Sequence, residues 1–356
     1  MKTLPRLSLG LTGKCNLQCR MCNIPDAEGT VFDMPDETVE RILNTVHTVK
    51  IKKAYFCGWG EPFLSPRIFD CLTYFRKLDI PTTVQTNGTL LEELADRIIE
   101  ERPDVIDVSI HGGDETSYTR VMSGSSLERL IRGLDALKYS GNGYNNRPLV
   151  GRFIYCAAAD TIETLPRIVE LASKYRVREV FVQYIQEPAE PPSRTALRYG
   201  DIDGNGTYAG VMEKASESAK DTGVKLTFDR QFYIQANLNK DEHISRRRTR
   251  LCTSPWTVME ILHTSEYRVC GYPEMPNIMP LPSDFTLFGL WNDPQVLAVR
   301  RGLASGNLHP WCSVCRYRQN VPLHQMKKKV RITRLSSTIA GKAASRIVSR
   351  KKIQRF

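Results

Sequence analysis

Short β-type segments alternate with helix-type segments from the start of the chain to about Thr222. Alternating or β-branched runs are typical of strands, whereas apolar residues three or four positions apart are typical of helices. The expected strands cover residues 6–12, 53–57, 81–86, 105–110, 149–156 and 179–185. The expected helices cover residues 35–49, 67–78, 90–101, 127–139, 162–175 and 208–222. Asp33 is the expected cap of the first helix.

This alternation predicts an α/β fold with parallel strands, because a helix between two strands makes a right-handed crossover. Six such units favour a partial (β/α)6 TIM-like barrel over a closed barrel of eight strands, with the chemistry at the carboxyl ends of the strands. The rhythm is lost after about Phe228, and the segment that follows has short runs and many turns. We therefore expect a core domain at residues 1–222, a small irregular domain held by metal at residues 223–325, and a tail at residues 326–356.

The composition is that of an ordinary globular protein, with 41% hydrophobic and 25% charged residues. No apolar stretch is long enough to span a bilayer, and the first residues lack the apolar region of a signal peptide. The sequence therefore predicts a cytoplasmic protein. In that compartment the ten cysteines are expected to be thiols or metal ligands, not disulfides.

The net charge of +11 comes from the tail, since residues 326–356 contain eleven Lys or Arg and no acid. The rest of the chain is balanced, which argues against a nucleic-acid-binding core. Apolar tail residues recur every three or four positions: Ile332, Leu335, Ile339, Ala343 and Ile347. A basic amphipathic helix of this kind predicts peripheral membrane contact or docking of a partner. A tail that packs on the barrel or stays disordered is the alternative.

Three cysteines follow the first expected strand: Cys15, Cys19 and Cys22. Three and then two residues separate them, so one compact loop can direct three thiolates at one iron–sulfur cube. Three ligands leave one iron open to bind a cofactor or substrate directly. Zinc or unligated thiols are the alternative, although zinc sites usually recruit four ligands in near pairs.

These residues resemble the signature of the radical S-adenosylmethionine (radical SAM) enzymes, including Met21 before the third cysteine. After the second expected strand, Gly58, Trp59, Gly60 and Glu61 stand where that family has a Gly-Gly-Glu motif. The resemblance implies that this turn holds the methionyl amino group of S-adenosylmethionine (SAM). Trp59 departs from the motif, because it replaces the first of the two glycines.

The resemblance continues at the ends of later strands. It places Asn87 near the cofactor and Ser109 near the ribose or carboxylate of SAM. His111 stands where many relatives have Asp; it could bond the cofactor, shuttle a proton or be structural. Gln183 is an expected adenosine contact.

Four more cysteines lie in the C-terminal part: Cys252, Cys270, Cys312 and Cys315. Four thiolates complete one closed site, for which Zn²⁺ is the alternative occupant. The surrounding residues resemble the SPASM-type auxiliary-cluster domain of the same family. That resemblance implies a second [4Fe–4S] cluster, and therefore two clusters in all. Among the remaining cysteines, Cys71 and Cys156 are expected to be buried in a helix and a strand.

The sequence thus predicts an enzyme that cleaves SAM reductively and abstracts hydrogen from a substrate in an oxidative modification. An external donor of the flavodoxin or ferredoxin type would supply the electron. The substrate is expected to be a peptide or a small, sugar-like molecule. A non-catalytic iron–sulfur electron carrier is the alternative, but such a protein has no need of a methionine-binding turn.

Overall fold

The structure is a computed structural model that describes residues 1–22, 31–138, 148–184, 202, 205–229, 252–270 and 279–313. The chain divides into two compact units. Unit 1 contains Met1–Leu9, Met34–Ala54 and Asp241–Phe356, and unit 2 contains Gly10–Asp33 and Tyr55–Lys240. Each unit therefore joins segments that are far apart in the sequence.

The main sheet of unit 2 follows the strand order β11-β10-β9-β7-β6-β5. The four neighbouring pairs from β6 to β11 are all parallel. The strands are β5 (Ala54–Phe56, which begins at the unit boundary), β6 (Thr82–Thr86), β7 (Val105–Ser109), β9 (Val150–Ala157), β10 (Glu179–Tyr184) and β11 (Lys225–Phe228). Strands β3 (Gln18–Cys19) and β8 (Met122–Ser123) form a separate antiparallel pair. The predicted α/β class with an open, partial barrel is confirmed.

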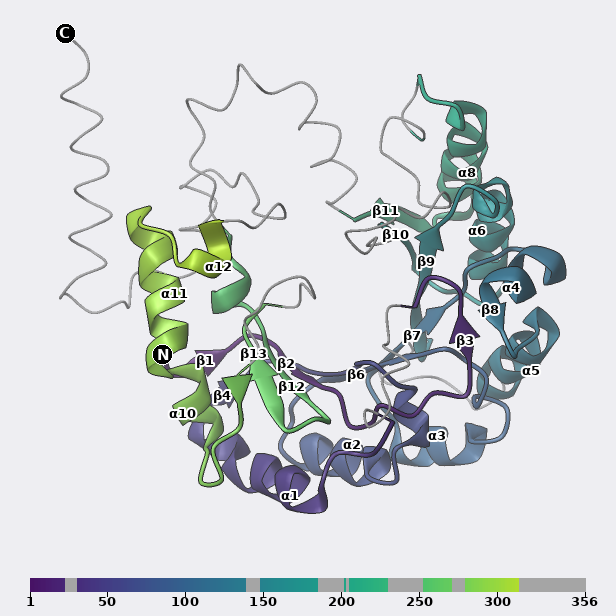
Figure 1. Ribbon diagram of the computed structural model, residues 1–356. Helices are drawn as coiled ribbons and strands as arrows, with labels where there is room; N and C mark the ends of the chain where they lie inside the picture. The colour runs from purple at the N-terminus through teal and green to yellow at the C-terminus, as the bar shows by residue number, and fades with distance from the viewer. Residues whose placement is uncertain are drawn as a thin grey trace, which may run out of the picture. The chain divides into compact units, whose positions relative to one another are not determined.

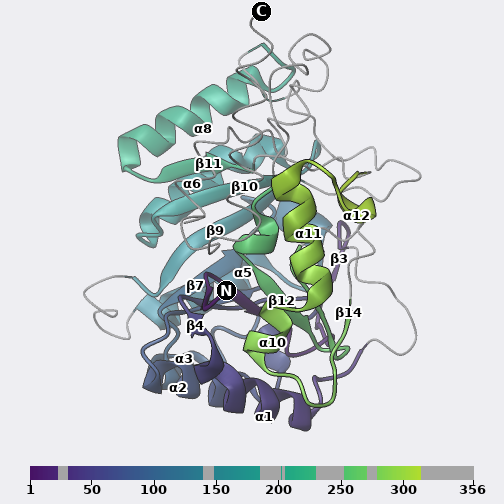
Figure 2. The ribbon, with the colours of Figure 1, turned by 90° about the vertical axis from the view of Figure 1, so that its left-hand side faces the viewer.

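Helices follow the strands of unit 2 and lie along the outer side of its sheet (Figure 1). They are α2 (Ile68–Lys77), α3 (Ala95–Glu101), α4 (Glu115–Val121), α5 (Leu127–Lys138), α6 (Leu165–Lys174) and α8 (Ala209–Thr222), with short 3-10 helices η2 (Pro62–Leu64) and η4 (Ile162–Thr164). Helix α5 shows why they form, since its leucines at positions 127, 130, 134 and 137 make one buried stripe. Figure 2 shows α8 and α6 beside β11 and β10 at one end of the sheet.

Residues on each strand of unit 2 alternate between the helix side and the inner side of the sheet. Ile106 and Val108 are fully buried, and Phe56 packs edge-on against Phe75 of α2 with ring centroids 5.8 Å apart. Because side chains alternate along a strand, Asp107 and Tyr55 face the opposite, inner side. The outer face is therefore the apolar core, and the inner face carries polar groups.

Three local features differ from the sequence expectation. Helix α4 was not expected, although Asp114 and Ser117 form a complete capping box at its start. Strand β11 follows the last predicted helix and extends the parallel sheet by one strand. Asp33 was the wrong cap for the first helix: Pro35 occupies that position, and Asp33 instead pairs with Lys14.

Unit 1 is built from short strands and four helices within the described residues. A sheet follows the order β2-β12-β13-β14, in which β2 and β12 are parallel and the other pairs antiparallel. Its strands are β2 (Leu7–Leu9), β12 (Met259–Leu262), β13 (Glu266–Arg268) and β14 (Met279–Pro280), with a separate pair β1 (Thr3–Leu4) and β4 (Lys50–Ile51). The helices are α1 (Asp36–Thr45), α10 (Leu287–Trp291), α11 (Pro294–Ser305) and α12 (Pro310–Ser313), with 3-10 turns η1 (Val46–Thr48) and η5 (Ser254–Trp256).

Trp291 is the largest fully buried side chain among the described residues of unit 1. Its indole N–H donates to the Thr3 carbonyl at 3.0 Å, which ties the N-terminal strand to α10. Arg41 of α1 reaches the Phe285 carbonyl at 3.4 Å. The early helix is thus held to the C-terminal part by polar contacts as well as by packing.

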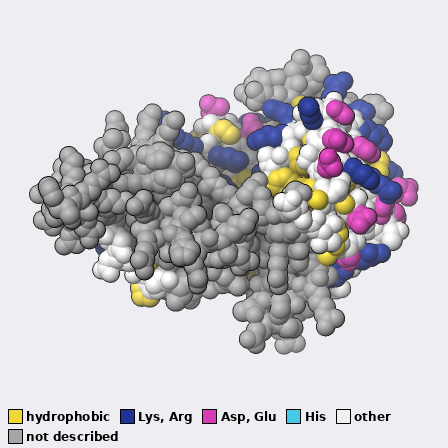
Figure 3. All heavy atoms as spheres, turned by 90° about the horizontal axis from the view of Figure 1, so that it is seen from above, with side chains coloured by type: hydrophobic (Ala, Val, Ile, Leu, Met, Phe, Trp, Pro, Cys, Tyr) yellow, Lys and Arg dark blue, Asp and Glu magenta, His cyan; other side chains and the backbone are white. Residues whose placement is uncertain are grey.

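Lys and Arg side chains are interspersed with Asp and Glu on the described part of the face in Figure 3. Across the described ranges, no helix is long and apolar enough to cross a membrane. The predicted basic tail at residues 326–356 lies outside the residues that the structure describes.

Candidate active site

The cysteine loop of unit 2 begins at a short bridge between distant residues. Thr12 pairs with Asp33 in antiparallel fashion, and Lys14 Nζ lies 2.7 Å from an Asp33 carboxylate oxygen. The Lys14 amide also donates to the Thr12 hydroxyl at 3.0 Å. These contacts fix the chain just before the first cysteine of the loop.

The three cysteines of this loop lie at its surface. Cys15 and Cys22 are exposed, and Cys19 is half-buried in β3, where it pairs with Met122 of β8. The Cys22 amide donates to the Cys19 carbonyl at 2.9 Å, so a tight turn brings the third cysteine back beside the second. Met21, within that turn, is half-buried.

The thiols of this loop are close enough to repel one another when ionised. Burial, together with the neighbouring thiolates of Cys22 and Cys15, raises the pKa of Cys19 to about 12. Metal ligation favours the thiolate and removes this penalty. Three thiolates on one loop therefore fit a [4Fe–4S] cluster with one open iron. No three His, Cys, Asp or Glu side chains within the described residues are grouped as ligands of a single metal ion.

The turn after β5 packs directly against the backbone that leads into the cysteine loop. A Cβ on Gly60 would lie 2.3 Å from the Lys14 carbonyl and 2.7 Å from that of Thr12. A Cβ on Gly58 would lie 2.9 Å from Gly10 Cα. These distances are shorter than any tolerated contact, so the close approach requires glycine at both positions.

Glu61 follows these glycines and joins the turn to the end of β6. Its amide donates to the Lys14 carbonyl at 2.8 Å, and its side chain is 2% exposed. One carboxylate oxygen accepts from the Phe63 amide at 3.1 Å and the Thr86 hydroxyl at 2.8 Å; the other accepts from the Asn87 amide at 2.7 Å. Burial raises the pKa of Glu61 to about 7, and the three hydrogen bonds oppose that rise. These three partners are neutral donors, so a cation beside this carboxylate would stabilise its charge.

Asn87 lies between Glu61 and the first cysteine. Its amide nitrogen donates to Asn16 Oδ1 at 2.9 Å and lies 3.8 Å from Cys15 Sγ. Its oxygen accepts from the amide and the hydroxyl of Thr89, at 2.9 and 2.7 Å. Thr89 also accepts from Asn16 Nδ2 at 2.8 Å, which closes a ring of polar contacts. Sequence reasoning expected Asn87 near the cofactor, and the structure brings it to the cysteine loop.

The other predicted site residues lie at or just beyond the carboxyl ends of their strands. Ser109 ends β7 and is half-buried, as is Gln183, which pairs with Cys156 in the β9–β10 register. His111 is buried, and its Nδ1 accepts the Cys156 amide at 3.1 Å. Burial lowers the pKa of His111 to about 3, so the ring is neutral at neutral pH. Of the roles that the sequence left open for His111, this geometry favours the structural one.

A charged network on the inner face of the sheet was not expected from the sequence. Asp107 is 3% exposed and accepts the Tyr55 hydroxyl at 2.7 Å and a hydrogen bond from Arg152 Nη2. Tyr55 also lies within 3.1 Å of Gln85 Oε1, and the Arg152 guanidinium lies 5.3 Å from the Phe181 ring centre. The register pairs Gln85 with Asp107 and Asp107 with Arg152, so these residues share one level of the sheet. The sequence signal that could have indicated this network is Asp107, a charged residue in the middle of an apolar strand.

The second set of cysteines lies in unit 1. Cys252 precedes η5, Cys270 follows β13 and Cys312 lies in α12, and all three are half-buried. Cys252 and Cys312 pack against the same buried cluster, which is formed by Trp256, Val299 and Leu303. Cys315 lies outside the described residues. The structure therefore brings two of the four predicted ligands to one apolar cluster.

Arg300 of α11 holds the segment that follows Cys252. It is 3% exposed; its Nε donates to the Pro255 carbonyl at 2.7 Å and its Nη1 to the Trp291 carbonyl at 2.6 Å. The guanidinium stacks on the Trp291 ring, with Cζ 3.9 Å from the ring centre. Burial lowers the pKa of Arg300 to about 9, which leaves it charged at neutral pH.

The chain is similar in sequence to known proteins over about half of its length. Residues 9–172 match the family model described as the radical SAM superfamily. A Thermoplasma volcanium protein described as probable GTP 3′,8-cyclase is 24% identical over 194 residues, which are 54% of this chain and 58% of that protein. A Pyrococcus furiosus tungsten-containing aldehyde ferredoxin oxidoreductase cofactor-modifying protein is 28% identical over 41% of this chain and 42% of its own length. The chain thus spans about half the length of the curated relatives it matches.

Solved structures with a similar fold cover most of the chain. Streptococcus suis SuiB superposes with a TM-score of 0.63 and 17% identity, over 85% of this chain and 68% of SuiB. The structure of anSMEcpe with bound AdoMet has a TM-score of 0.59 and 14% identity, over 88% of both chains. At these identities the likeness concerns the fold.

Proposed function

Residues 9–172 belong to the radical SAM superfamily, and from this premise we propose that the chain cleaves SAM reductively and abstracts hydrogen from a substrate. The observation that carries the proposal is the meeting of three sequence-distant elements. Asn87 Nδ2 lies 3.8 Å from Cys15 Sγ, and the Asn87 amide lies 2.7 Å from a Glu61 oxygen. The cysteine loop, the glycine turn and the end of β6 thus lie side by side, which supports a single cofactor site.

The chain's own residues would bind and orient the cofactor. Cys15, Cys19 and Cys22 would hold a [4Fe–4S] cluster, which when bound supplies the electron that cleaves SAM to a 5′-deoxyadenosyl radical. Glu61 would take the methionyl ammonium, since the three donors that its carboxylate meets among the described residues are neutral and leave acceptor capacity for a cation. Asn87 would position that ammonium indirectly, because its backbone amide orients the Glu61 carboxylate.

The remaining predicted contacts complete the cofactor site. Gly58 and Gly60 would let the turn approach the cofactor without side chains, as they already let it approach the loop backbone. Ser109 and Gln183 lie at the carboxyl ends of β7 and β10, with β9 between them in the parallel sheet, where ribose and adenine contacts are expected.

We further propose that Cys252, Cys270, Cys312 and Cys315 hold an auxiliary [4Fe–4S] cluster. Support comes from the packing of Cys252 and Cys312 on one apolar cluster. An auxiliary cluster can accept an electron from a substrate radical, which suits an oxidative modification. An external flavodoxin or ferredoxin would reduce the first cluster.

The substrate belongs to one of two classes, a peptide or a small, sugar-like molecule. Fold neighbours include SuiB bound to precursor peptide SuiA and anSMEcpe bound to a peptide, which favours the first class. Relatives described as probable GTP 3′,8-cyclases favour the second, because GTP carries a ribose. Transfer of deuterium from a labelled peptide or from labelled GTP into 5′-deoxyadenosine would distinguish the two classes.

Formation of 5′-deoxyadenosine tests the central proposal. The protein is reconstituted anaerobically with iron and sulfide, reduced with dithionite and incubated with SAM. We expect 5′-deoxyadenosine from the wild-type chain. A chain that holds iron and accepts electrons yet leaves SAM intact would instead be an electron carrier, the alternative function.

A further inference from the structure

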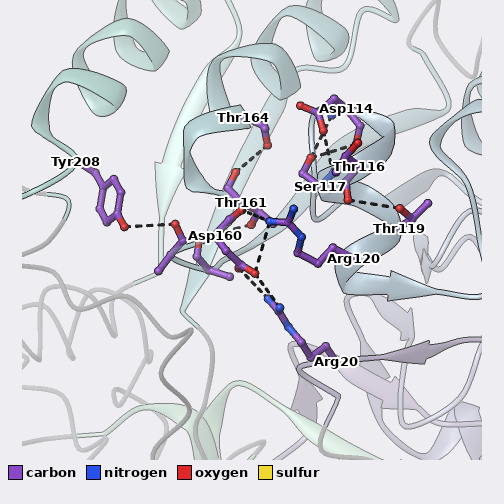
Figure 4. A network of polar contacts seen from close by, with 12 residues as sticks. Arg20, Asp114, Thr116, Ser117, Thr119, Arg120, Asp160, Thr161, Thr164 and Tyr208 are labelled. Carbon is purple, nitrogen blue, oxygen red and sulfur yellow. Dashed lines mark hydrogen bonds and ion pairs between the residues drawn. The ribbon is translucent and has the colours of Figure 1, made fainter.

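Asp160 receives contacts from two arginines on separate segments of unit 2 (Figure 4). Arg20, directly after Cys19, donates to both Asp160 carboxylate oxygens, with both N···O distances 2.8 Å. Arg120 of α4 donates to the Asp160 backbone carbonyl at 3.3 Å, and its Nη1 lies 4.0 Å from Oδ2. Planar two-point pairing fixes direction as well as distance, so Asp160 sets where the Arg20 side chain lies.

The turn that carries Asp160 is itself held by several hydrogen bonds. Tyr208 donates to the Ala159 carbonyl at 3.3 Å, and the hydroxyls of Tyr155 and Thr161 lie 3.0 Å apart. The Thr161 amide donates to the Ala158 carbonyl at 3.1 Å. Asp160 therefore lies in a well-held turn after β9, where its carboxylate can hold the Arg20 side chain in place.

Within the described residues, side-chain contacts attach the two halves of the cysteine loop to the ends of different strands of the sheet. Its first half is attached to the end of β6, through Asn16 and Asn87. Its second half is attached to the end of β9 through Arg20, whose amide also donates to the Val121 carbonyl at 2.9 Å. The first attachment is part of the expected cofactor site, whereas the second contacts none of the residues that the sequence assigned to SAM.

We propose that the Arg20–Asp160 pair is a positioning device that fixes Cys19 and Cys22 relative to Cys15 and balances the charge beside the first cluster. The inference rests on the proposed function, since it concerns the cluster on these three cysteines. Arg20 stands between the proposed ligands Cys19 and Cys22 in the sequence, so its positive charge stabilises the reduced, more negative cluster. The Asp160 carboxylate paired with Arg20 offsets that stabilisation. The two side chains are 36% and 31% exposed, so solvent screens the pair in part.

Single variants of the pair should differ from the wild-type chain in iron release and in reduction potential. Arg20→Gln and Asp160→Asn each break the anchor, so each should release iron to a chelator faster, by about fivefold for a pair worth ~1 kcal/mol. Their effects on the reduction potential should have opposite signs. Asp160→Asn leaves Arg20 unbalanced and raises the potential, whereas Arg20→Gln leaves Asp160 unbalanced and lowers it.

The double variant separates anchoring from charge. Its rate of iron release should match that of either single variant, because each single substitution already removes the whole Arg20–Asp160 interaction. Its potential should return toward the wild-type value, because both charges are gone. Arg132→Gln is the control: Arg132 Nε donates to both carboxylate oxygens of Glu92, at 3.0 and 3.2 Å, and this ion pair links α5 to the segment before α3. We expect no change in either measurement for that control.

The experiment uses the reconstituted full-length chain, with the first cluster identified by the change that SAM causes in its electron paramagnetic resonance signal. Absence of any SAM-sensitive signal in the wild-type chain would contradict the proposed function itself. If that signal is present, two outcomes overturn the positioning role. One is potentials that shift in the same direction in both single variants; the other is iron release no faster than in Arg132→Gln.

Discussion

The two cysteine regions of this protein differ in what surrounds them. In unit 2, Cys15 and Cys22 are exposed, and polar contacts join their loop to the ends of β6 and β9. In unit 1, Cys252 and Cys312 are half-buried and pack on the apolar side chains of Trp256, Val299 and Leu303. The environment of a metal centre controls its access and its electronic properties. A polar, open loop suits a cluster that must admit a cofactor, whereas an apolar site suits a closed cluster that only exchanges electrons.

Replacing the two cysteine sets separately gives the largest expected difference. Cys15, Cys19 and Cys22 changed to Ala should leave about four of about eight irons and abolish 5′-deoxyadenosine. Cys252, Cys270 and Cys312 changed to Ala should also leave about four irons, but SAM cleavage should continue. Iron analysis and chromatography of the nucleoside check both results. Continued SAM cleavage in the first variant, or its loss in the second, would contradict the division of roles.

The first region could be predicted closely from the sequence, and the reason is geometric. Parallel strands direct their carboxyl ends to one edge, so motifs after successive strands converge even though they are far apart in the chain. Cys15, Glu61 and Asn87 follow three different strands, and hydrogen bonds join them in the structure. Cys71 was also expected to be buried in a helix, and it is 1% exposed in α2.

Contacts between charged side chains could not be predicted from the sequence. Arg20 and Asp160 are 140 positions apart, and nothing local to either residue marks the other as its partner. Asp107 and Arg152 likewise meet only through the register of β7 and β9. Strand register depends on the packing of the whole sheet, so a single sequence reveals the strands but not these pairs.

Glu61→Gln should have the next largest effect, on SAM affinity. The substitution removes the charge that would pair with the methionyl ammonium and places an N–H₂ group against N–H donors. We expect binding to weaken by about 1.5–3 kcal/mol, with the iron content unchanged. Anaerobic equilibrium titration with SAM measures the affinity. The matched control is Glu115→Gln, whose carboxylate accepts the Leu127 amide at 2.9 Å. Equal affinities in Glu61→Gln and the control would remove Glu61 from the cofactor site.

Arg300→Met tests the second region without touching a cysteine. It leaves the carbonyls of Pro255 and Trp291 without their donor, at a cost of about 1–3 kcal/mol in unfolding free energy. Arg300→Lys keeps the charge but not the two-point geometry, and should recover only part of the loss. Thermal unfolding and iron release to a chelator measure the effect. Because Arg300 holds the segment after Cys252, the iron released early should amount to one cluster, and SAM cleavage should persist. Early loss of SAM cleavage would show that the two regions are not independent.

The smallest expected effect is a pH dependence from His111 in the first region. Burial lowers the pKa of His111 from 6.5 to about 3 in the folded chain. As the pH falls, His111 is protonated in the unfolded chain at a higher pH than in the folded chain, which favours unfolding. The free energy of unfolding is therefore highest above pH 6.5 and decreases progressively toward pH 3. Between pH 7.5 and 5.5 the loss is about 1.4 kcal/mol, by the linkage between proton binding and unfolding.

His111→Asn provides the comparison, because Asn Oδ1 can accept the Cys156 amide in place of Nδ1 yet does not titrate. We expect the variant to lose less stability than the wild-type chain over the same pH range, as measured by denaturant titration of the reconstituted protein. The buried Arg300 of the second region stays charged throughout this range, so Arg300→Met should leave the pH dependence unchanged. A variant His111→Asn with the full wild-type pH dependence would assign the acid sensitivity to other groups. That result would mean that His111 has the same pKa in the folded and unfolded chains and is accessible in the folded site. It would favour the proton-shuttle role over the structural one.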